Sequence, residues 1–158
     1  CSRDLNEWED WLCSIFKARG LSVLVTTAQE HDRAMGIVQV LTHQTTEVLG
    51  RTIEKLDVDV QKTLEFTSPI YLMELLMTAR HFAQSSELYA SIQMNNPETG
   101  KILQALQDAG NELRDVVLSN DRVAFSKIFD DVHNHFGSFS EQALEQSSFL
   151  IDRLVERG

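Results

Sequence analysis

Proline is nearly absent from this chain of 158 residues, and both of its two prolines stand where a helix can begin. Ser68 precedes Pro69, so the serine can cap a helix and the proline can take the first helical position, where its missing N–H costs nothing. Asn96–Pro97 can open another helix. Only seven glycines interrupt the rest of the chain. We therefore predict an all-α fold, a multi-helix domain built from long helices.

Capping residues and apolar periodicity place the individual helices. Thr27 and Glu30 have the spacing of a capping box, and a helix can run from Ala28 to about Lys55 without meeting a proline. The remaining helices are expected around Val60–Leu64, from Pro69, from Ser86 to about Asn95, from Asn96–Pro97 to near Asn120, from an Asp121 cap to Gly137, and from a Ser138 or Ser140 cap onward.

The first 27 residues follow a different pattern. An apolar stripe predicts a helix with Asp4 as its cap and Gly20 as its stop; the stripe consists of Leu5, Trp8, Leu12 and Ile15. Residues 21–27 are short and rich in β-branched side chains, which predicts a strand. Because a lone strand leaves its backbone groups without partners, we interpret residues 1–27 as the last helix and strand of another domain, and 28–158 as the helical domain.

Composition and charge argue against several classes of protein. The formal net charge is −10 and the pI about 4.8, which disfavours a general nucleic-acid or anionic-membrane surface. Two cysteines without CxxC spacing indicate neither a disulfide framework nor a zinc site. No apolar run reaches the roughly 18 residues of a membrane span, and no signal-peptide pattern is present. We expect a cytoplasmic protein, and a chain beginning at Cys1 is expected to be a piece of a longer one.

Arg80 is the residue whose setting most needs an explanation. No other Lys or Arg occurs between Lys62 and Lys101, and the surrounding predicted helix is strongly apolar. An unpaired buried cation is costly, and arginine cannot escape that cost by deprotonation. Its partner is then either a structural carboxylate, such as Glu74, or the carboxylate of a ligand, held by charge-assisted hydrogen bonds. Position alone leaves both alternatives open.

His43, Tyr89 and a histidine pair are further candidates, each with an ordinary structural alternative. His43 lies in the middle of a long predicted helix, where it can be a core or surface residue or a ligand-binding one. Tyr89 can fold back toward Arg80 or simply fill the core. His133 and His135 are two residues apart and lie on different helix faces, so we expect no metal site. The chain has no GxSxG, P-loop or GxGxxG motif, and the pattern predicts no catalytic machinery of its own.

Several motifs occur in an order that resembles a known family. They are Glu30-His31-Asp32, Ile37-x-Gln39-x-Leu41-x-His43, Ser68-Pro69-Ile70-Tyr71, Arg80-x-Phe82-Ala83-Gln84 and Leu88-Tyr89-Ala90-x-Ile92-Gln93-Met94. Over nearly its whole length the chain resembles the C-terminal helical dimerisation domain of prephenate dehydrogenase, closest to the bifunctional form fused to chorismate mutase. Leu72 departs from that pattern, because the enteric form has a second arginine directly after SPIY. A secondary anion contact at this position is therefore not carried over.

The resemblance implies an activity and roles for individual residues. In the family, an N-terminal Rossmann-type domain binds NAD or NADP, and the helical domain forms an interlocked homodimer. The enzyme converts prephenate to 4-hydroxyphenylpyruvate by oxidative decarboxylation, on the route to tyrosine. Arg80 matches the arginine that grips a substrate carboxylate, and His43 matches a histidine near the substrate side chain that is linked to tyrosine feedback. Tyr89 occupies an aromatic pocket position, and Gln84 and Gln39 are further pocket candidates.

The resemblance also implies what this chain is not expected to contain. The general-base histidine and the glycine-rich cofactor loop belong to the nucleotide domain, and no residue here matches either. The fragment is therefore expected to be inactive alone, with no catalytic residue and no cofactor or metal of its own. Its expected ligands are prephenate, 4-hydroxyphenylpyruvate or tyrosine. The alternatives are a helical oligomerisation module without a ligand and a tyrosine-sensing regulatory domain.

Overall fold

The computed structural model describes the backbone of residues 3–156 and the side chains of residues 8–156. Every regular element in these residues is a helix, as the all-α prediction requires. The chain divides into two compact units, Cys1–Ala34 and Met35–Gly158. None of the described helices is long and apolar enough to cross a bilayer.

The first unit contains helix α1, an irregular segment and most of helix α2. Helix α1 spans Arg3–Ala18, so Asp4 lies inside its first turn rather than at the cap. Gly20 ends the helix as predicted, with φ of +78°. In the described part of the apolar stripe, Trp8 is 62% exposed and Leu12 43%; the Leu5 side chain lies outside the described residues.

The predicted strand at residues 21–27 is not formed, because this segment has no regular secondary structure. A strand is stable only when its N–H and C=O groups bond to a neighbour, and the described residues contain no other strand to pair with it. The segment leads into α2, Ala28–Met35. Thr27 and Glu30 form the predicted capping box there: the Thr27 N–H donates to Glu30 Oε2 at 3.0 Å, and the Glu30 N–H donates to Thr27 Oγ1 at 3.2 Å.

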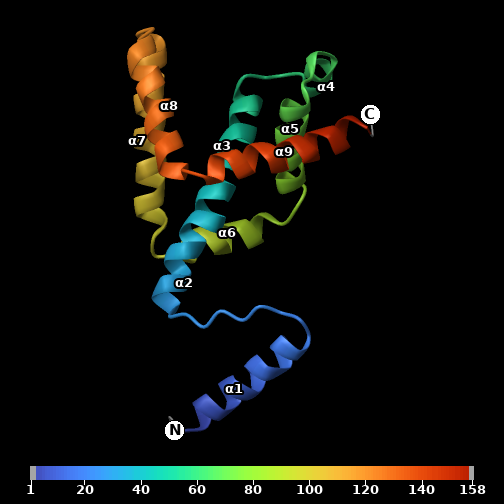
Figure 1. The fold of residues 1–158 in the computed structure, drawn as a ribbon. Coiled ribbons are helices and arrows are strands. Elements are labelled where there is room, and N and C mark those ends of the chain that lie inside the picture. The colour runs from blue at the N-terminus through green and yellow to red at the C-terminus, as the bar shows by residue number, and fades with distance from the viewer. Residues whose placement is uncertain (1–2, 157–158) are drawn as a thin grey trace. The chain divides into compact units, whose positions relative to one another are not determined.

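Most helices of the second unit agree with the sequence pattern (Figure 1). Ser68 Oγ accepts from the Tyr71 N–H at 3.2 Å, and an Asp121 carboxylate oxygen accepts from the Ala124 N–H at 3.0 Å. Gly137 ends a helix with φ of +54°. Ser138 precedes the last helix, but its side chain makes no capping hydrogen bond. The elements are η1 (Gly36–Leu41), α3 (Thr42–Lys55), α4 (Val60–Thr63), η2 (Leu64–Phe66), α5 (Pro69–Phe82), α6 (Ser86–Asn95), α7 (Thr99–Leu118), α8 (Arg122–Phe136) and α9 (Phe139–Val155).

Helical residues are uninterrupted from Ala28 to Lys55, but η1 within them is a π-helix. Such wide turns are rare and often occur at functional sites. Gly36 at its start lies against Ile102 of α7: a Cβ built on Gly36 would come within 2.6 Å of Ile102 Cδ1. This close approach holds η1 against α7, immediately before the helix that carries His43.

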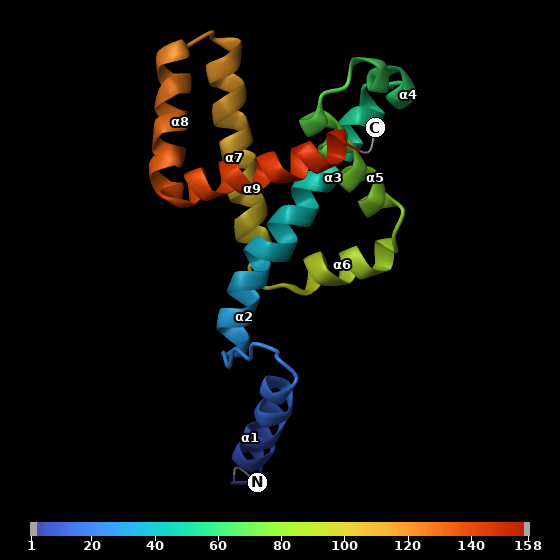
Figure 2. The ribbon, with the colours of Figure 1, turned by 45° about the vertical axis from the view of Figure 1, so that its right-hand side comes forward.

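The long helical segment formed by η1 and α3 is central to the second unit, with α6 and α7 against η1 and α5 against α3. Helix α9 lies against α5, and α7 and α8 form a hairpin (Figure 2). Val40 and Ile102 are the only buried large apolar residues among the described side chains, and only Val40 is completely buried. Large apolar side chains remain exposed on almost every helix; on α8 they are Val123, Phe125, Phe129, Val132 and Phe136. The core of this unit is therefore small for its number of apolar residues.

Candidate functional site

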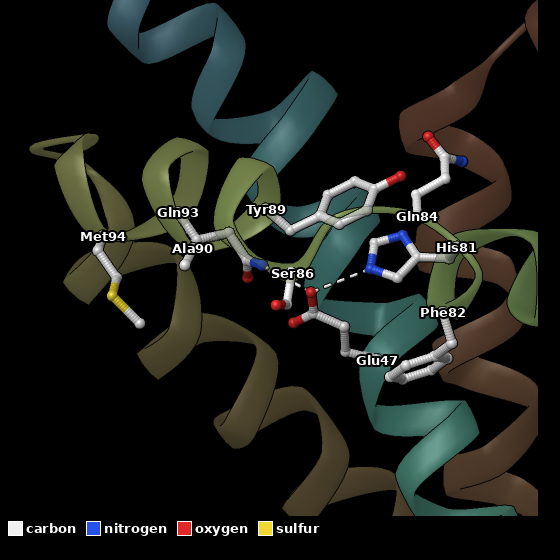
Figure 3. Close-up of a pocket in the computed structure, with 9 residues that line it drawn as sticks. All are labelled: Glu47, His81, Phe82, Gln84, Ser86, Tyr89, Ala90, Gln93 and Met94. Carbon is white, nitrogen blue, oxygen red and sulfur yellow. Dashed lines mark hydrogen bonds and ion pairs between the residues drawn. The ribbon is translucent and has the colours of Figure 1, made fainter.

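Helices α3, α5 and α6 enclose a cavity of about 240 Å³ in the second unit (Figure 3). We call it the Glu47 cavity. Polar side chains form one part of its wall, and Phe82, Ala90 and Met94 supply apolar surface. The complete lining is Glu47, His81, Phe82, Gln84, Ser86, Tyr89, Ala90, Gln93 and Met94. A cavity with apolar walls and a few convergent polar groups is typical of a small-molecule site.

A carboxylate is at the centre of the polar part. Glu47 Oε1 accepts a hydrogen bond from His81 Nε2 at 3.0 Å and a second from Gln93 Nε2 at 2.8 Å. The His81 side chain is only 8% exposed and that of Glu47 28%. Because the carboxylate accepts, His81 carries a proton on Nε2. Three helices thus meet in one polar network, which fixes the ring plane of His81.

Three rings continue this network. The His81 and Tyr89 rings are stacked, with centroids 3.8 Å apart and an interplanar angle of 25°. His43 meets Tyr89 edge-on at 4.8 Å and lies 5.4 Å from His81. Tyr89 is therefore held between two imidazoles, and its orientation depends on both.

The charge of His43 is set by these surroundings. Burial lowers the pKa of His43, and the nearby His81 lowers it further, while the Glu47 carboxylate acts in the opposite direction. A histidine whose pKa lies below its ordinary value of 6.5 is mostly neutral at pH 7. His43 therefore adds no full positive charge beside the Glu47 cavity.

Helical spacing explains how α3 and α6 each contribute two polar groups to the network. His43 and Glu47 are four residues apart on one helix, as are Tyr89 and Gln93 on α6. Residues at this spacing share a helix face. The contacts between helices span 34 residues for His81 with Glu47 and 46 for Gln93 with Glu47. The fold, rather than any local motif, brings them together.

The structure brings only some of the predicted site residues together. Tyr89 and Gln84 line the Glu47 cavity, and His43 touches it through the Tyr89 ring. Gln84 Nε2 also donates to the Arg80 carbonyl at 3.3 Å. Gln39 is half-buried on η1 and is not among the lining residues.

The structure corrects the predicted setting of Arg80. Its side chain is exposed rather than buried. Among the described residues it forms no ion pair, and Glu74 in particular does not reach it. Arg80 and His81 are neighbours in α5, and consecutive residues on a helix point about 100° apart. Arg80 therefore lies outside the lining of the Glu47 cavity.

Sequence reasoning missed Glu47, His81 and Gln93. A usable signal existed for two of them, because Glu47 and Gln93 each follow a candidate residue by one helical turn. His81 gives no such signal, since its partner Glu47 lies 34 residues away in the sequence. Leu72, which replaces the family arginine, lines a separate apolar cavity of about 330 Å³ with residues such as Ile53 and Leu76.

The described residues offer no metal centre, because they contain no group of three or more His, Cys, Asp or Glu side chains that could hold an ion. They also lack a glycine-rich turn between a strand and a helix, the arrangement that binds a dinucleotide pyrophosphate.

Comparison with known proteins shows which family this chain belongs to. The sequence model of the family described as "Prephenate dehydrogenase, dimerization domain" matches residues 27–131. The chain belongs to this family, which confirms the resemblance drawn from its motifs. The match begins at the capping box of α2 and includes every residue that lines the Glu47 cavity.

Individual relatives cover almost the whole chain. A "Probable arogenate/prephenate dehydrogenase" of Methanocaldococcus jannaschii is 38% identical over 149 residues, 94% of this chain and 33% of the relative. The "T-protein" of Haemophilus influenzae is 34% identical over 153 residues, which are 97% of this chain and 41% of the relative. The "T-protein" of Enterobacter agglomerans is 28% identical over 151 residues, which are 96% of this chain and 40% of the relative. The chain thus spans between a third and two fifths of the length of these relatives.

Proposed function

We propose that this chain supplies the substrate-binding and dimerisation part of a prephenate dehydrogenase of tyrosine biosynthesis. The enzyme would convert prephenate to 4-hydroxyphenylpyruvate with NAD or NADP as the hydride acceptor. The ring carbon bearing the hydroxyl loses a hydride to the nicotinamide, and the hydroxyl gives its proton to a general base. The ring carboxylate then leaves as CO2, the electrons of the broken bond make the ring aromatic, and its oxygen takes a proton back to form the phenol. The observation that carries this proposal is the family match over residues 27–131.

The residues of this chain would bind and orient the substrate rather than make or break bonds. Arg80 pairs with no acid among the described residues, and its five N–H donors suit a bidentate grip on a carboxylate. His43, Tyr89 and Gln84 would lie along the rest of the substrate, with Gln39 further away on η1. Fixing both ends of a small molecule lowers the entropic part of the reaction barrier.

The cofactor and the general base are proposed to lie in the nucleotide domain; the support is that the described residues contain no glycine-rich turn between a strand and a helix. We propose residues 1–27 as the end of that domain and 28–158 as the dimerisation and substrate-binding domain. Two apolar side chains support this division: Leu24 is 85% exposed and Val25 67%. Apolar residues in an extended segment need a sheet or core to cover them.

A homodimer is the proposed assembly of the helical domain. The support is the large set of exposed apolar side chains beside only two buried ones among the described residues, together with the description of the family. Obligate dimers often leave such a surface on each protomer, because the second copy completes the core.

The name of the Methanocaldococcus jannaschii relative includes arogenate as well as prephenate. Arogenate carries an amino group where prephenate carries a keto group, and the two molecules are otherwise alike. We therefore include arogenate among the candidate substrates of this enzyme.

The test is a substitution of Arg80 in the full-length protein, assayed by nicotinamide reduction. Arg80→Ala is expected to raise the KM for prephenate about 10- to 100-fold, the equivalent of a charge-assisted hydrogen bond of about 1.5–3 kcal/mol. The KM for the nicotinamide cofactor should stay unchanged. Arg51→Ala is the matched control, because Arg51 is also exposed but pairs with Glu54 on its own helix. Unaltered prephenate kinetics in Arg80→Ala would remove the role assigned here.

A further inference from the structure

The Glu47 carboxylate has one oxygen whose hydrogen-bonding capacity is unused. Oε1 accepts from His81 and Gln93, whereas no hydrogen bond to Oε2 comes from the residues that the structure describes. An ionised carboxylate can accept about four hydrogen bonds. Glu47 lines the cavity (Figure 3), so its spare acceptor capacity is available to a ligand.

The charge of the Glu47 cavity favours a ligand group that donates hydrogen bonds over a negatively charged ligand group. Among its lining residues, only Glu47, His81 and Tyr89 can ionise near neutral or basic pH. If His81 is neutral, the Glu47 charge is uncompensated; if His81 is protonated, the pair has no net charge. His43, the other titratable group touching these rings, is held neutral by its lowered pKa. As long as the Glu47 carboxylate is ionised, the cavity therefore offers no net positive charge to a ligand carboxylate.

We propose that the Glu47 cavity receives the ammonium group of an α-amino acid, and that Glu47 distinguishes such a ligand from its keto counterpart. This inference rests on the proposed function. An ammonium group has three N–H donors, and the cavity presents acceptors on Glu47, Ser86 and Tyr89. Phe82, Ala90 and Met94 supply the apolar surface that a hydrocarbon ring needs.

A keto group in the same place would bind less tightly than an ammonium group. Its oxygen is an acceptor only and would face the Glu47 oxygen with no proton between them. A site built to bond a polar group discriminates strongly, because its own buried polar atoms lose their partners with the wrong ligand. Two amino ligands are compatible with this chemistry: arogenate as substrate, and tyrosine as product or inhibitor.

The experiment uses the full-length enzyme with Glu47→Gln. The glutamine side chain keeps an oxygen that can accept from His81 and Gln93, but it loses the charge. We expect kcat/KM for arogenate to fall about tenfold or more relative to kcat/KM for prephenate. Glu54→Gln is the matched control, an exposed acid on the same helix outside the cavity, and it should leave the ratio unchanged.

A second arm measures ligand binding by calorimetry, with L-tyrosine and 4-hydroxyphenylpyruvate as the amino and keto probes. A tenfold loss of tyrosine affinity in Glu47→Gln, without an equal loss for the keto acid, supports the proposal even if arogenate is no substrate. Ser86→Ala leaves the Glu47 network intact and should weaken the amino ligand selectively by about threefold. This variant decides the question if Glu47→Gln does not fold.

Two results would overturn the inference: both amino-to-keto ratios stay unchanged, or amino and keto ligands lose affinity equally, as a purely structural role of Glu47 requires. Failure of the proposed function looks different. In that case the wild-type enzyme oxidises neither prephenate nor arogenate, and the tyrosine binding arm still tests Glu47.

Discussion

Replacing Gly36 by alanine tests how tightly η1 packs against α7. The added Cβ would lie 2.6 Å from Ile102 Cδ1 and 3.4 Å from the Glu98 Cβ. Ile102 is only 8% exposed, so its methyl group has little room to move away. Overpacking a close-packed site costs about 1–3 kcal/mol, while alanine in a helix regains about 0.5–1 kcal/mol over glycine. We expect a net loss of about 0.5–2 kcal/mol in the free energy of unfolding.

The assay is thermal unfolding followed by circular dichroism at one fixed protein concentration. For a chain of this length, 1 kcal/mol lowers Tm by about 2–4 °C. Gly110→Ala in α7 is the matched control, because a Cβ there meets nothing within 4 Å. This control is expected to gain about 0.5–1 kcal/mol from helix propensity.

A double substitution identifies the atom responsible. Ile102→Val removes the Cδ1 methyl that meets the new Cβ, and alone it costs about 0.5–1.5 kcal/mol. If the clash is the cause, adding Gly36→Ala to Ile102→Val should cost almost nothing further. A Gly36→Ala variant as stable as the wild type, or equal losses in both backgrounds, would refute the packing argument.

Two further predictions concern the capping box and the assembly. The Thr27 N–H, the Thr27 hydroxyl and the Thr26 hydroxyl hold the pKa of Glu30 below its ordinary value. A depressed carboxyl pKa contributes stability above the unfolded pKa and loses it as pH falls through the folded one. The first turn of α2 should therefore fray in acid. Thr27→Ala should raise the Glu30 pKa measured by NMR, and an unchanged Glu30 pKa would contradict the hydrogen bond from the Thr27 hydroxyl to Glu30. The full-length protein should sediment at twice its chain mass, and a monomer would contradict the proposed dimer.

The helix boundaries were predictable because their causes are local. A capping serine, threonine or aspartate acts within three residues, as at Thr27, Ser68 and Asp121. Proline at a first helical position and glycine with positive φ act on their own backbone. The strand at residues 21–27 failed for the opposite reason. β-branched side chains favour a strand, but pairing with another segment decides whether one forms.

The candidate site was predictable only where it follows helical spacing. His43 and Tyr89 could be selected from their positions and the family resemblance, while His81 depends on a contact 34 residues away in sequence. Arg80 is an error of another kind, because the sequence predicted a burial that the fold does not provide. An apolar sequence neighbourhood predicted burial, but an isolated helix cannot reveal which of its faces the fold covers. The structure leaves the Arg80 side chain exposed and buries His81 instead.

The stability of the helical unit and its assembly are best treated as one equilibrium. Each fully buried large apolar side chain contributes about 1.5–3 kcal/mol, yet only Val40 and Ile102 are buried to that degree among the described residues. Ordering a helical domain of this length costs far more in conformational entropy than two such residues return. Half-buried apolar residues such as Leu72 and Leu75 supply part of the balance, and in the proposed dimer the apolar surface that is exposed in one chain would supply more. Because association then stabilises the folded state by mass action, Tm should rise with protein concentration, and a concentration-independent Tm would show that one chain holds its fold alone.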